Sequence, residues 1–280
     1  MNVLIAGAGG ILGTNLVKRY LEKGDNVTAM VLKAAEMRGL QHKNLKIIEA
    51  NVTRPETIAG ICTGQNIVIS CIGITRIKEE VTHEVVDYKG NLNLIDDAVK
   101  NKIGKFGFIS PAGTDDGKDE VPLLNAKYKL EEDLKKSGLK WVIFRSGGFF
   151  SDLAETKKMA LKGPLFVIGD GTQRSTPIAV EDLADLMVAD MAKAENEMIN
   201  VGGPEDLSWL DICRITFDII GKPPRIMKIP IWLCRFTLVL LKPFTFKYYA
   251  MGALLLFMST RDIMTPRRGK MKLSAYLRAG

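Results

Sequence analysis

The sequence predicts a doubly wound α/β protein, in which helices cover both faces of a parallel sheet, followed by a smaller C-terminal lobe. Short apolar runs alternate with helix-length amphipathic segments through the first half of the chain. A glycine-rich turn directly follows the first apolar run, and the alternation stops near residue 147. Runs that are apolar on both faces suit the strands of a parallel sheet, because helices bury both of its faces.

Six short runs are the expected strands of this sheet. They are Asn2–Ala6, Val27–Val31, Leu45–Glu49, Ile67–Cys71, Phe106–Ser110 and Lys140–Phe144. The segments between them are long enough for crossover helices, and residues 85–99 carry apolar side chains at helical spacing. Ligands of such sheets bind at the carboxyl edge, so we expect the functional site there.

The composition is that of an ordinary globular protein. The chain has 280 residues, of which 46% are hydrophobic and 25% charged, and this excludes a disordered chain. No apolar run reaches the roughly 18 residues of a membrane span, and the N-terminus lacks the features of a signal peptide, so we expect a cytoplasmic protein. Four cysteines without a CxxC pair and only two histidines predict no metal site.

The positive charge is concentrated at the C-terminal end. Residues 222–280 hold twelve Lys and Arg and a single acid, Asp262, a net charge of +11. The remaining 221 residues carry a net charge of −4. Because these basic residues border strongly apolar stretches rather than polar ones, we expect no nucleic-acid partner. An anionic membrane surface or a large acidic, apolar ligand fits the mixture better.

Residues 7–13 read Gly-Ala-Gly-Gly-Ile-Leu-Gly, between the first expected strand and a helix. Gly7 permits a tight turn, Gly10 lets backbone amides approach a pyrophosphate, and Gly13 lets the helix lie close to the sheet. The pattern opens a βαβ unit, the context in which it indicates dinucleotide binding. The expected cofactor contacts in this loop are Gly7, Gly9, Gly10, Ile11, Leu12 and Gly13.

The glycine loop makes the first part of the chain a Rossmann-type, dinucleotide-binding core over residues 1–146. Turn-rich sequence from about residue 147 onward separates shorter elements. We expect residues 147–280 to form a substrate lobe that is still part of one compact unit and ends in an apolar, basic tail over residues 229–280.

The end of the second expected strand bears on the choice between NADP and NAD. An acid there would bond the ribose 2′-hydroxyl of NAD, whereas a base would accept the 2′-phosphate of NADP. No acid stands at the strand end, and Lys33, with Arg38 nearby, favours NADP. NAD is the alternative, in which case Lys33 is an ordinary exposed charge.

Further motifs are residues 87–96, Ala126-Lys127 with Glu131, residues 149–152, Gly169-Asp170-Gly171 and Pro177-Ile178. Together with the glycine loop they resemble the atypical, NmrA-like short-chain dehydrogenase/reductase superfamily, over nearly the whole chain. Through Arg145, residues 149–150, residues 180–184 and residues 200–204, the second half is most similar to one branch. That branch contains divinyl chlorophyllide reductases and the NAD(P)-binding subunit of respiratory complex I.

The resemblance implies catalytic roles for Lys127, which would hold the nicotinamide ribose, and for Ser110, whose hydroxyl would bond a substrate oxygen. A hydroxyl that only closes the strand end is the alternative for Ser110. Better-studied members carry a Tyr four residues before the Lys, and here that position is Leu123. Without the phenol as proton donor, alcohol–ketone chemistry of the standard kind is not expected.

The resemblance also implies contacts at the adenosine and substrate ends of the site. Asn51 stands where an Asp commonly touches the adenine, and Gly73 should lie under the adenosine or ribose, where a close backbone approach needs a small residue. Phe149 and Phe150 are the expected substrate contacts.

The apolar tail admits three interpretations. Residues 229–258 form two apolar arms around Lys242-Pro243-Phe244, each about a dozen residues long and so below a bilayer span. They are helices that cap the lobe, an interfacial hairpin that dips into a membrane, or a lid over a hydrophobic substrate.

These features predict an NADPH-dependent reductase that acts on a hydrophobic small molecule. The branch that contains divinyl chlorophyllide reductases implies reduction of activated double bonds, which needs a hydride donor and an apolar pocket more than it needs the missing Tyr. The alternative is a non-catalytic NAD(P)-binding protein, serving as a redox sensor or as a subunit or assembly factor of a membrane complex. The sequence leaves the substrate, the oligomeric state and the direction of the reaction open.

Overall fold

A computed structural model describes residues 1–74 and 81–279. The chain divides into two compact units. Unit 1 comprises Met1–Ser110, Asn125–Arg145 and Leu183–Ile199, and unit 2 comprises Pro111–Leu124, Ser146–Asp182 and Asn200–Gly280, of which Gly280 is outside the described residues. One crossing between the units, at residues 145/146, lies beside the predicted boundary. The chain also crosses between the units elsewhere, so that residues 111–124 belong to unit 2 and residues 183–199 belong to unit 1.

A seven-stranded sheet with the order β3-β2-β1-β4-β5-β6-β9 forms the centre of the fold. Its strands are β1 (Asn2–Ala6), β2 (Asn26–Val31), β3 (Leu45–Glu49), β4 (Ile67–Ser70), β5 (Lys105–Pro111), β6 (Trp141–Ser146) and β9 (Glu197–Val201). β1 pairs in parallel with β2 on one side and with β4 on the other. The predicted doubly wound, Rossmann-type parallel sheet is confirmed, and its strand order reverses between β1 and β4, where ligands of this fold bind.

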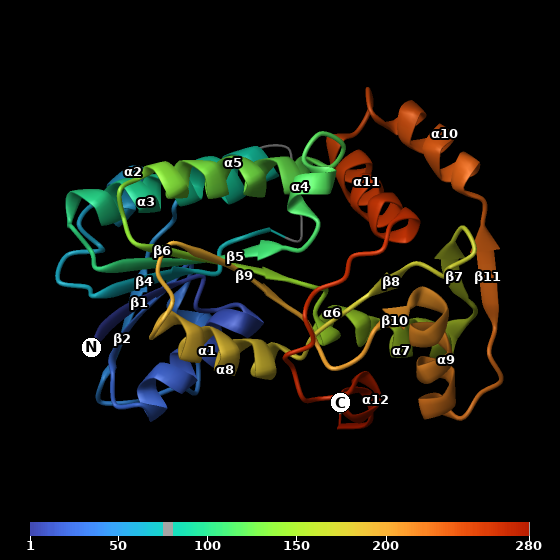
Figure 1. Cartoon of the computed structure of the whole chain (residues 1–280), viewed down its shortest axis with the longest axis horizontal. Helices are drawn as coiled ribbons and strands as arrows, with labels where there is room; N and C mark the ends of the chain where they lie inside the picture. The colour runs from blue at the N-terminus through green and yellow to red at the C-terminus, as the bar shows by residue number, and fades with distance from the viewer. Residues whose placement is uncertain (75–80, 280) are drawn as a thin grey trace. The chain divides into compact units, whose positions relative to one another are not determined.

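Helices cover both faces of the sheet (Figure 1). One face carries α2 (Pro55–Ile58), α3 (Asn91–Lys100) and α5 (Pro122–Lys136), and the other carries α1 (Ile11–Glu22) and α8 (Val180–Met191). A short 3₁₀ turn, η1 (Ala34–Met37), follows β2, and a π-helix, η2 (Glu84–Gly90), leads directly into α3.

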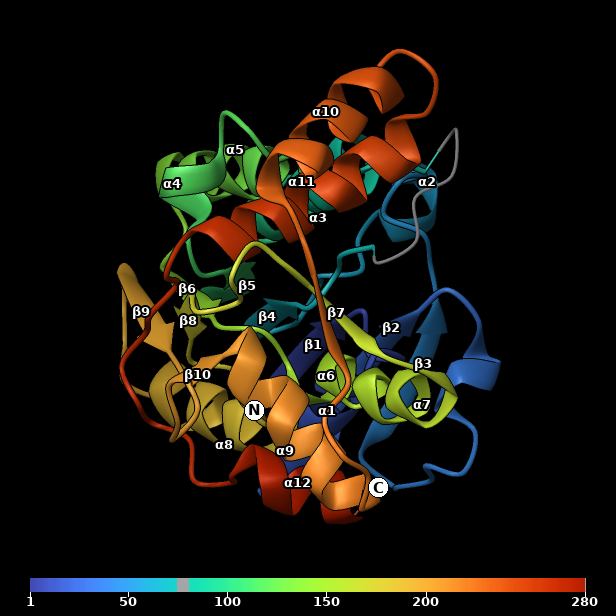
Figure 2. The ribbon, with the colours of Figure 1, turned by 90° about the vertical axis from the view of Figure 1, so that its right-hand side faces the viewer.

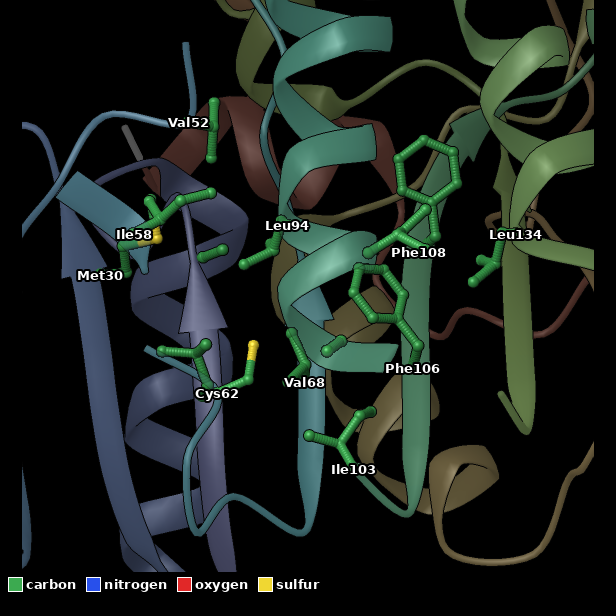
Figure 3. Close-up of a cluster of buried hydrophobic side chains, with 14 of the residues drawn as sticks. Met30, Val52, Ile58, Cys62, Val68, Leu94, Ile103, Phe106, Phe108 and Leu134 are labelled. Carbon is green, nitrogen blue, oxygen red and sulfur yellow. The ribbon is translucent and has the colours of Figure 1, made fainter. Parts of the chain in front are cut away.

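A large hydrophobic core of unit 1 lies between the sheet and helices α2, α3 and α5 (Figure 3). Phe106 and Phe108 on β5 are completely buried there, against Leu94 of α3 and Leu134 of α5. Both phenylalanines occupy the same face because side chains alternate along a strand. This packing fixes β4 and β5, whose carboxyl ends carry several expected site residues.

Strand β9 is not among the six strands predicted from the sequence. β9 is the last strand in the sheet order, so only one of its edges is paired. Its residues are partly exposed except for the buried Val201. Glu197 and Asn200 interrupt its apolar residues, so this edge strand does not show the unbroken apolar run that predicts a buried strand.

Unit 2 consists of short helices and two small two-stranded sheets, β10 with β8 and β11 with β7. Its strands are β7 (Leu165–Ile168), β8 (Arg174–Ser175), β10 (Leu207–Ser208) and β11 (Ile226–Ile229). Its helices are α4 (Thr114–Gly117), α6 (Phe150–Leu153), α7 (Glu155–Lys162), α9 (Trp209–Ile220), α10 (Ile231–Leu241), α11 (Phe246–Thr260) and α12 (Leu273–Ala279).

Local sequence explains both ends of α9 in unit 2. Ser208 caps α9 by accepting from the backbone N–H of Asp211, and the Asp211 carboxylate accepts from the Ser208 N–H in return. Gly221, at φ +67°, ends the helix in the left-handed conformation that glycine adopts readily. The apolar face of α9 packs on Phe150, Leu273 and neighbouring side chains.

Candidate functional site

The glycine loop follows β1 at the point where the strand order reverses. Gly7 has a φ of +78°, which a glycine adopts at little cost, and the N–H groups of Gly7 and Ala8 both donate to the carbonyl of Met30 on β2. The Gly10 N–H donates to the Gly7 carbonyl at 3.1 Å. These bonds fold the backbone into a tight turn that leads directly into α1.

Gly10 and Gly13 serve different purposes in this loop. A Cβ atom at Gly13 would lie 2.7 Å from the Ala8 Cα, so only a glycine lets α1 pack this closely on the turn. Apart from its two chain neighbours, a Cβ atom at Gly10 would have one heavy atom of the described residues within 4 Å, the Gly7 carbonyl oxygen at 3.4 Å. Gly13 is therefore needed by the fold itself, whereas the residues that the structure describes leave the space in front of Gly10 open to a ligand.

The loop fits a pyrophosphate. Gly10 caps α1 without a side-chain hydrogen bond, and within the described chain the N–H groups of Ile11 and Leu12 donate to no acceptor. Free N–H groups at the positive end of a helix bind phosphate oxygens. Gly7, Gly9, Gly10, Ile11, Leu12 and Gly13 all lie in this turn and in the first residues of α1, where we expect them to hold the cofactor.

An acid that the sequence analysis did not weigh stands beside the loop. Glu36, on η1, lies against Gly9, where an added Cβ would be 2.7 Å from the Glu36 Cβ. Lys33 precedes the same 3₁₀ turn and is exposed. A carboxylate therefore lies against the glycine loop, and a lysine begins the turn that carries it. The turn that returns Glu36 to the loop is not visible in the sequence.

Asn51 lies in the loop after β3. Its side-chain oxygen accepts from the backbone N–H of Thr53 at 3.0 Å and from the Thr53 hydroxyl at 2.9 Å. These bonds shape the turn that leads to α2. The side chain of Asn51 therefore has a structural role in this loop, and an adenine contact by Asn51 stays a prediction.

Lys127 is buried in a compact charged cluster at the carboxyl end of β4. Its ammonium lies 3.2 Å from Asp87 Oδ1 and donates to the Ile72 carbonyl at 3.0 Å. It also lies over the Phe108 ring, 4.8 Å from the ring centre. Lys127 is thus fixed in direction by one carboxylate, one carbonyl and one aromatic face.

Asp87 organises this cluster. Its carboxylate is completely buried, and Oδ2 lies 3.0 Å from Nδ1 of the buried His83. An added Cβ at Gly73 would lie 2.8 Å from Asp87 Oδ1 and 3.4 Å from the Lys127 ammonium. The missing side chain of Gly73 therefore leaves room for the Asp87–Lys127 pair. His83 and Asp87, which the sequence analysis gave no role, complete what we call the charged corner: Gly73, His83, Asp87 and Lys127.

The charged corner is attached to the sheet through η2. Asp87 belongs to this π-helix, a rare conformation that occurs often at functional sites. Asn91 follows it, donates to the Asp87 carbonyl at 3.0 Å, and accepts from Ser70 at the end of β4 at 2.5 Å. The helix backbone that carries Asp87 is thus held at the carboxyl end of β4.

Cys71 lies next to the corner and stays protonated. Removal from water raises the pKa of its thiol to about 12, although the nearby Lys127 ammonium acts in the opposite direction. At neutral pH the side chain is therefore a neutral thiol rather than a nucleophilic thiolate.

Glu131 and Arg145 form a second buried ion pair in unit 1. Arg145, on β6, donates through Nε to Glu131 Oε1 at 3.1 Å and through Nη2 to Glu131 Oε2. Such a bidentate pair holds α5 against the sheet, one helical turn beyond Lys127.

Ser110, the other expected catalytic residue, is 2% exposed near the end of β5.

Leu123 occupies the first turn of α5, one turn before Lys127. Its side chain packs against the apolar cluster of Val121, Leu124 and Phe257 in unit 2.

Among the expected substrate contacts, Phe150 is completely buried in the core of unit 2, with its ring centre 5.6 Å from that of Tyr276. Phe149 is only partly buried and remains the better candidate for a ligand contact.

A family model described as NAD(P)H-binding matches residues 7–194, from the glycine loop to beyond α8. The chain belongs to this NAD(P)H-binding family. The predicted dinucleotide-binding function of the core is thereby confirmed, while the choice between NADP and NAD stays a prediction.

Relatives of this NAD(P)H-binding protein include assembly factors and a reductase. Photosystem II assembly factor Ycf39 of Cyanophora paradoxa is 29% identical over 236 residues, which cover 82% of this chain and 72% of that protein. The chloroplastic divinyl chlorophyllide a 8-vinyl-reductase of Arabidopsis thaliana is 28% identical over 264 residues, 85% of this chain and 62% of that protein. The predicted similarity to the divinyl chlorophyllide reductase branch is confirmed. The chain spans less than two thirds of the length of that reductase.

Solved structures share the fold. UDP-glucose 4-epimerase from Thermotoga maritima is 18% identical, with a TM-score of 0.75 over 99% of this chain and 96% of that chain. An NADPH-dependent quinone oxidoreductase from Escherichia coli, complexed with NADPH, is 14% identical, with a TM-score of 0.74 over 99% of each chain. At these identities the likeness concerns the fold alone.

Lys33 and Glu36 provide a test of which nucleotide this NAD(P)H-binding protein prefers. Lys33→Asp is expected to weaken NADPH at least about tenfold more than NADH, because it replaces an attraction to the 2′-phosphate with a repulsion. Glu36→Gln is expected to favour NADPH, since it removes a negative charge beside the loop. Calorimetric titration of both variants with both nucleotides measures the change, with Lys43→Asp as the exposed-lysine control. Equal losses for the two nucleotides would exclude contact between Lys33 and the 2′-phosphate.

Proposed function

We propose that this protein is an NADPH-dependent reductase of a hydrophobic small molecule. The charged corner carries this proposal, because it places a buried, oriented ammonium near the point where the strand order reverses. This is where the fold binds its ligands. In members of the superfamily that the sequence resembles, a lysine at the position of Lys127 holds the nicotinamide ribose.

A purely structural role would not favour such a cluster. Burying an ammonium and a carboxylate costs several kcal/mol per ion in lost hydration, and apolar residues of similar size often stabilise a fold as well or better. Buried ionisable groups that are held in one orientation therefore concentrate at functional sites. In this chain the Asp87–Lys127 pair is also accompanied by a buried imidazole and a neighbouring glycine.

The residues also favour one class of reaction. When bound, NADPH supplies a hydride. Leu123 offers no acidic hydrogen at the position of the usual proton donor, so a carbonyl reduction that relies on a phenol there is not supported. Reduction of an activated carbon–carbon double bond fits better, and the similar Arabidopsis protein is named as a vinyl-reductase. Lys127 would orient the nicotinamide ribose, and Phe149 would contribute apolar contact to the substrate.

Two measurements on the purified protein test the proposal. Mass spectrometry identifies any nucleotide that copurifies. Oxidation of NADPH is then followed with a panel of quinones, enones, and isoprenoid and tetrapyrrole lipids. Turnover with at least one apolar double-bond acceptor is expected. Tight nucleotide binding without turnover on the panel would reject the reductase.

Lys127→Met is expected to lower the rate of NADPH oxidation at least about a hundredfold, because loss of an orienting charge misplaces the reacting groups. NADPH affinity should fall much less, since the glycine loop supplies most of the phosphate contacts. Stopped-flow rates and calorimetric affinities separate the two effects. Lys136→Met, at an exposed position of the same helix, is the matched control. A rate that is equal in the Lys127 variant and the wild type would show that Lys127 takes no part in the reaction.

A second candidate function is a non-catalytic nucleotide-binding assembly factor or redox sensor. Leu123 favours it, because the position of the usual proton donor is occupied by a side chain packed into an apolar cluster. The similar Ycf39 proteins, which are named photosystem II assembly factors, also support it. For this function we expect tight NADPH binding and no turnover, together with a nucleotide-dependent change in hydrogen exchange.

A further inference from the structure

Helix α10 presents an apolar stripe to solvent. It has no buried residue, and Trp232, Phe236, Val239 and Leu240 are all more than half exposed. Their spacing of four, seven and eight residues places them on one face of the helix. A contiguous exposed apolar surface of this kind marks an interaction site rather than ordinary surface variation.

The apolar surface continues through the turn and along α11. Phe244, between the helices, is 85% exposed, the largest exposed fraction among the large hydrophobic side chains of the described chain. Phe246, Tyr248, Met251 and Leu255 of α11 are also exposed. We call residues 231–260 the hairpin, because α10 and α11 run side by side in both views (Figures 1 and 2).

The hairpin is held firmly although its outer surface is apolar. Ala250, Ala253 and Phe257 of α11 are buried, and Phe257 packs with Val121 and Leu124 of unit 2. A Cβ atom at Gly252 would lie 2.6 Å from Leu238 Cδ2, so the glycine lets α10 approach α11 closely. The capping interpretation therefore describes the inner face of α11 and leaves the outer face of α10 uncovered.

The charges of the hairpin have one sign. Residues 229–260 contain Arg235, Lys242 and Lys247 and no acid, within residues 222–280, which carry a net charge of +11. The Lys242 ammonium lies 5.5 Å from the Tyr249 ring centre, and the Lys247 ammonium lies 5.3 Å from that of Tyr248. Basic groups beside exposed aromatic and aliphatic side chains are typical of helices that lie in a membrane interface.

We propose that the hairpin binds the surface of an anionic lipid bilayer, with Trp232, Phe236 and Phe244 inserted among the lipids and Lys242 and Lys247 facing their phosphates. No helix in residues 1–74 and 81–279 is long and apolar enough to span a membrane. At 11 residues, α10 is about 17 Å long, roughly half of a bilayer core, so the hairpin would lie in the interface. The absence of acids favours anionic lipid over an apolar protein partner, since lipid phosphates complement all three bases.

Vesicle flotation tests this proposal on the full chain. Binding to phosphatidylcholine vesicles that contain phosphatidylglycerol is expected to exceed binding to pure phosphatidylcholine and to fall as salt is added. Lys242→Glu with Lys247→Glu should lower the partition coefficient at least about tenfold, given the attraction of each base to an anionic surface. The matched control, Lys43→Glu with Lys46→Glu, makes the same charge change on exposed lysines of unit 1 and should shift binding less than about twofold.

Trp232 gives a second readout of insertion. Its fluorescence should shift to shorter wavelength on anionic vesicles, and this shift should be absent in Trp232→Phe. Circular dichroism and NADPH affinity verify that each variant is folded. Vesicle binding that is independent of lipid charge, or that is unchanged in Lys242→Glu with Lys247→Glu, would overturn the proposal. A dimer in solution that Trp232→Ser with Phe236→Ser dissolves, without flotation, would also overturn it and assign the surface to a second copy of the chain.

Discussion

Gly10→Val is expected to abolish NADPH binding while the protein keeps its fold. The backbone at Gly10 has φ −73° and ψ 163°, a conformation open to any residue, and the added Cβ would meet the Gly7 carbonyl oxygen at an ordinary 3.4 Å. The valine methyl groups would occupy the space in front of the free N–H groups of α1. A pyrophosphate would lose its bonds to them, and we expect a loss in affinity of at least about a hundredfold.

Two further glycines make this result specific. Gly13→Ala places a Cβ 2.7 Å from the Ala8 Cα, so it should distort the loop and lower the thermal midpoint. Gly10→Val should leave the thermal midpoint unchanged. At Gly163 in unit 2, an added Cβ meets nothing within 4 Å in residues 1–74 and 81–279, and φ is an extended 175°. Gly163→Val should therefore alter neither the NADPH affinity nor the thermal midpoint. Calorimetry and thermal unfolding measure both quantities. Unchanged NADPH affinity in Gly10→Val would contradict the assignment of the loop.

The sequence was informative where a function depends on residues that are close together in the chain. The six predicted strands and the glycine loop are patterns of this kind, and β1 and β3 match their predicted bounds. The ends of β5 and β6 differ from the prediction by one or two residues, because strand ends depend on pairing with neighbours.

The charged corner could not be predicted in the same way. Asp87 and Lys127 are forty residues apart, and the polar residues around Asp87 are as typical of an exposed helix as of a buried site. The carboxylate comes to lie buried beside the ammonium only in the folded chain, where Asn91 bonds both to Ser70 at the end of β4 and to the Asp87 carbonyl. Similarly, Glu36 reaches Gly9 through a 3₁₀ turn, a local geometry that hydrophobic periodicity does not encode.

Asp87→Ala is expected to destabilise the protein by about 3–5 kcal/mol. The Asp87 carboxylate is fully buried and faces the buried Lys127 ammonium at 3.2 Å, so its removal leaves a charge without water and without its anionic partner. The cost therefore comes chiefly from the ion left behind, rather than from the lost attraction between the two groups. Urea denaturation followed by circular dichroism measures the change.

A double variant separates this cause from simple loss of packing. Asp87→Leu with Lys127→Met replaces both ions with apolar side chains, and it should recover most of the stability that Asp87→Leu alone loses, since no buried charge is left unpaired. Asp96→Ala removes an exposed carboxylate from the adjacent helix α3 and should change stability by less than about 0.5 kcal/mol. If the double variant were instead as unstable as the single one, the loss would come from packing around Asp87 and not from the charge on Lys127. If the double variant recovers its stability, the fold does not need the two ions. The rate of NADPH oxidation by this stable variant then shows directly whether the reaction needs them.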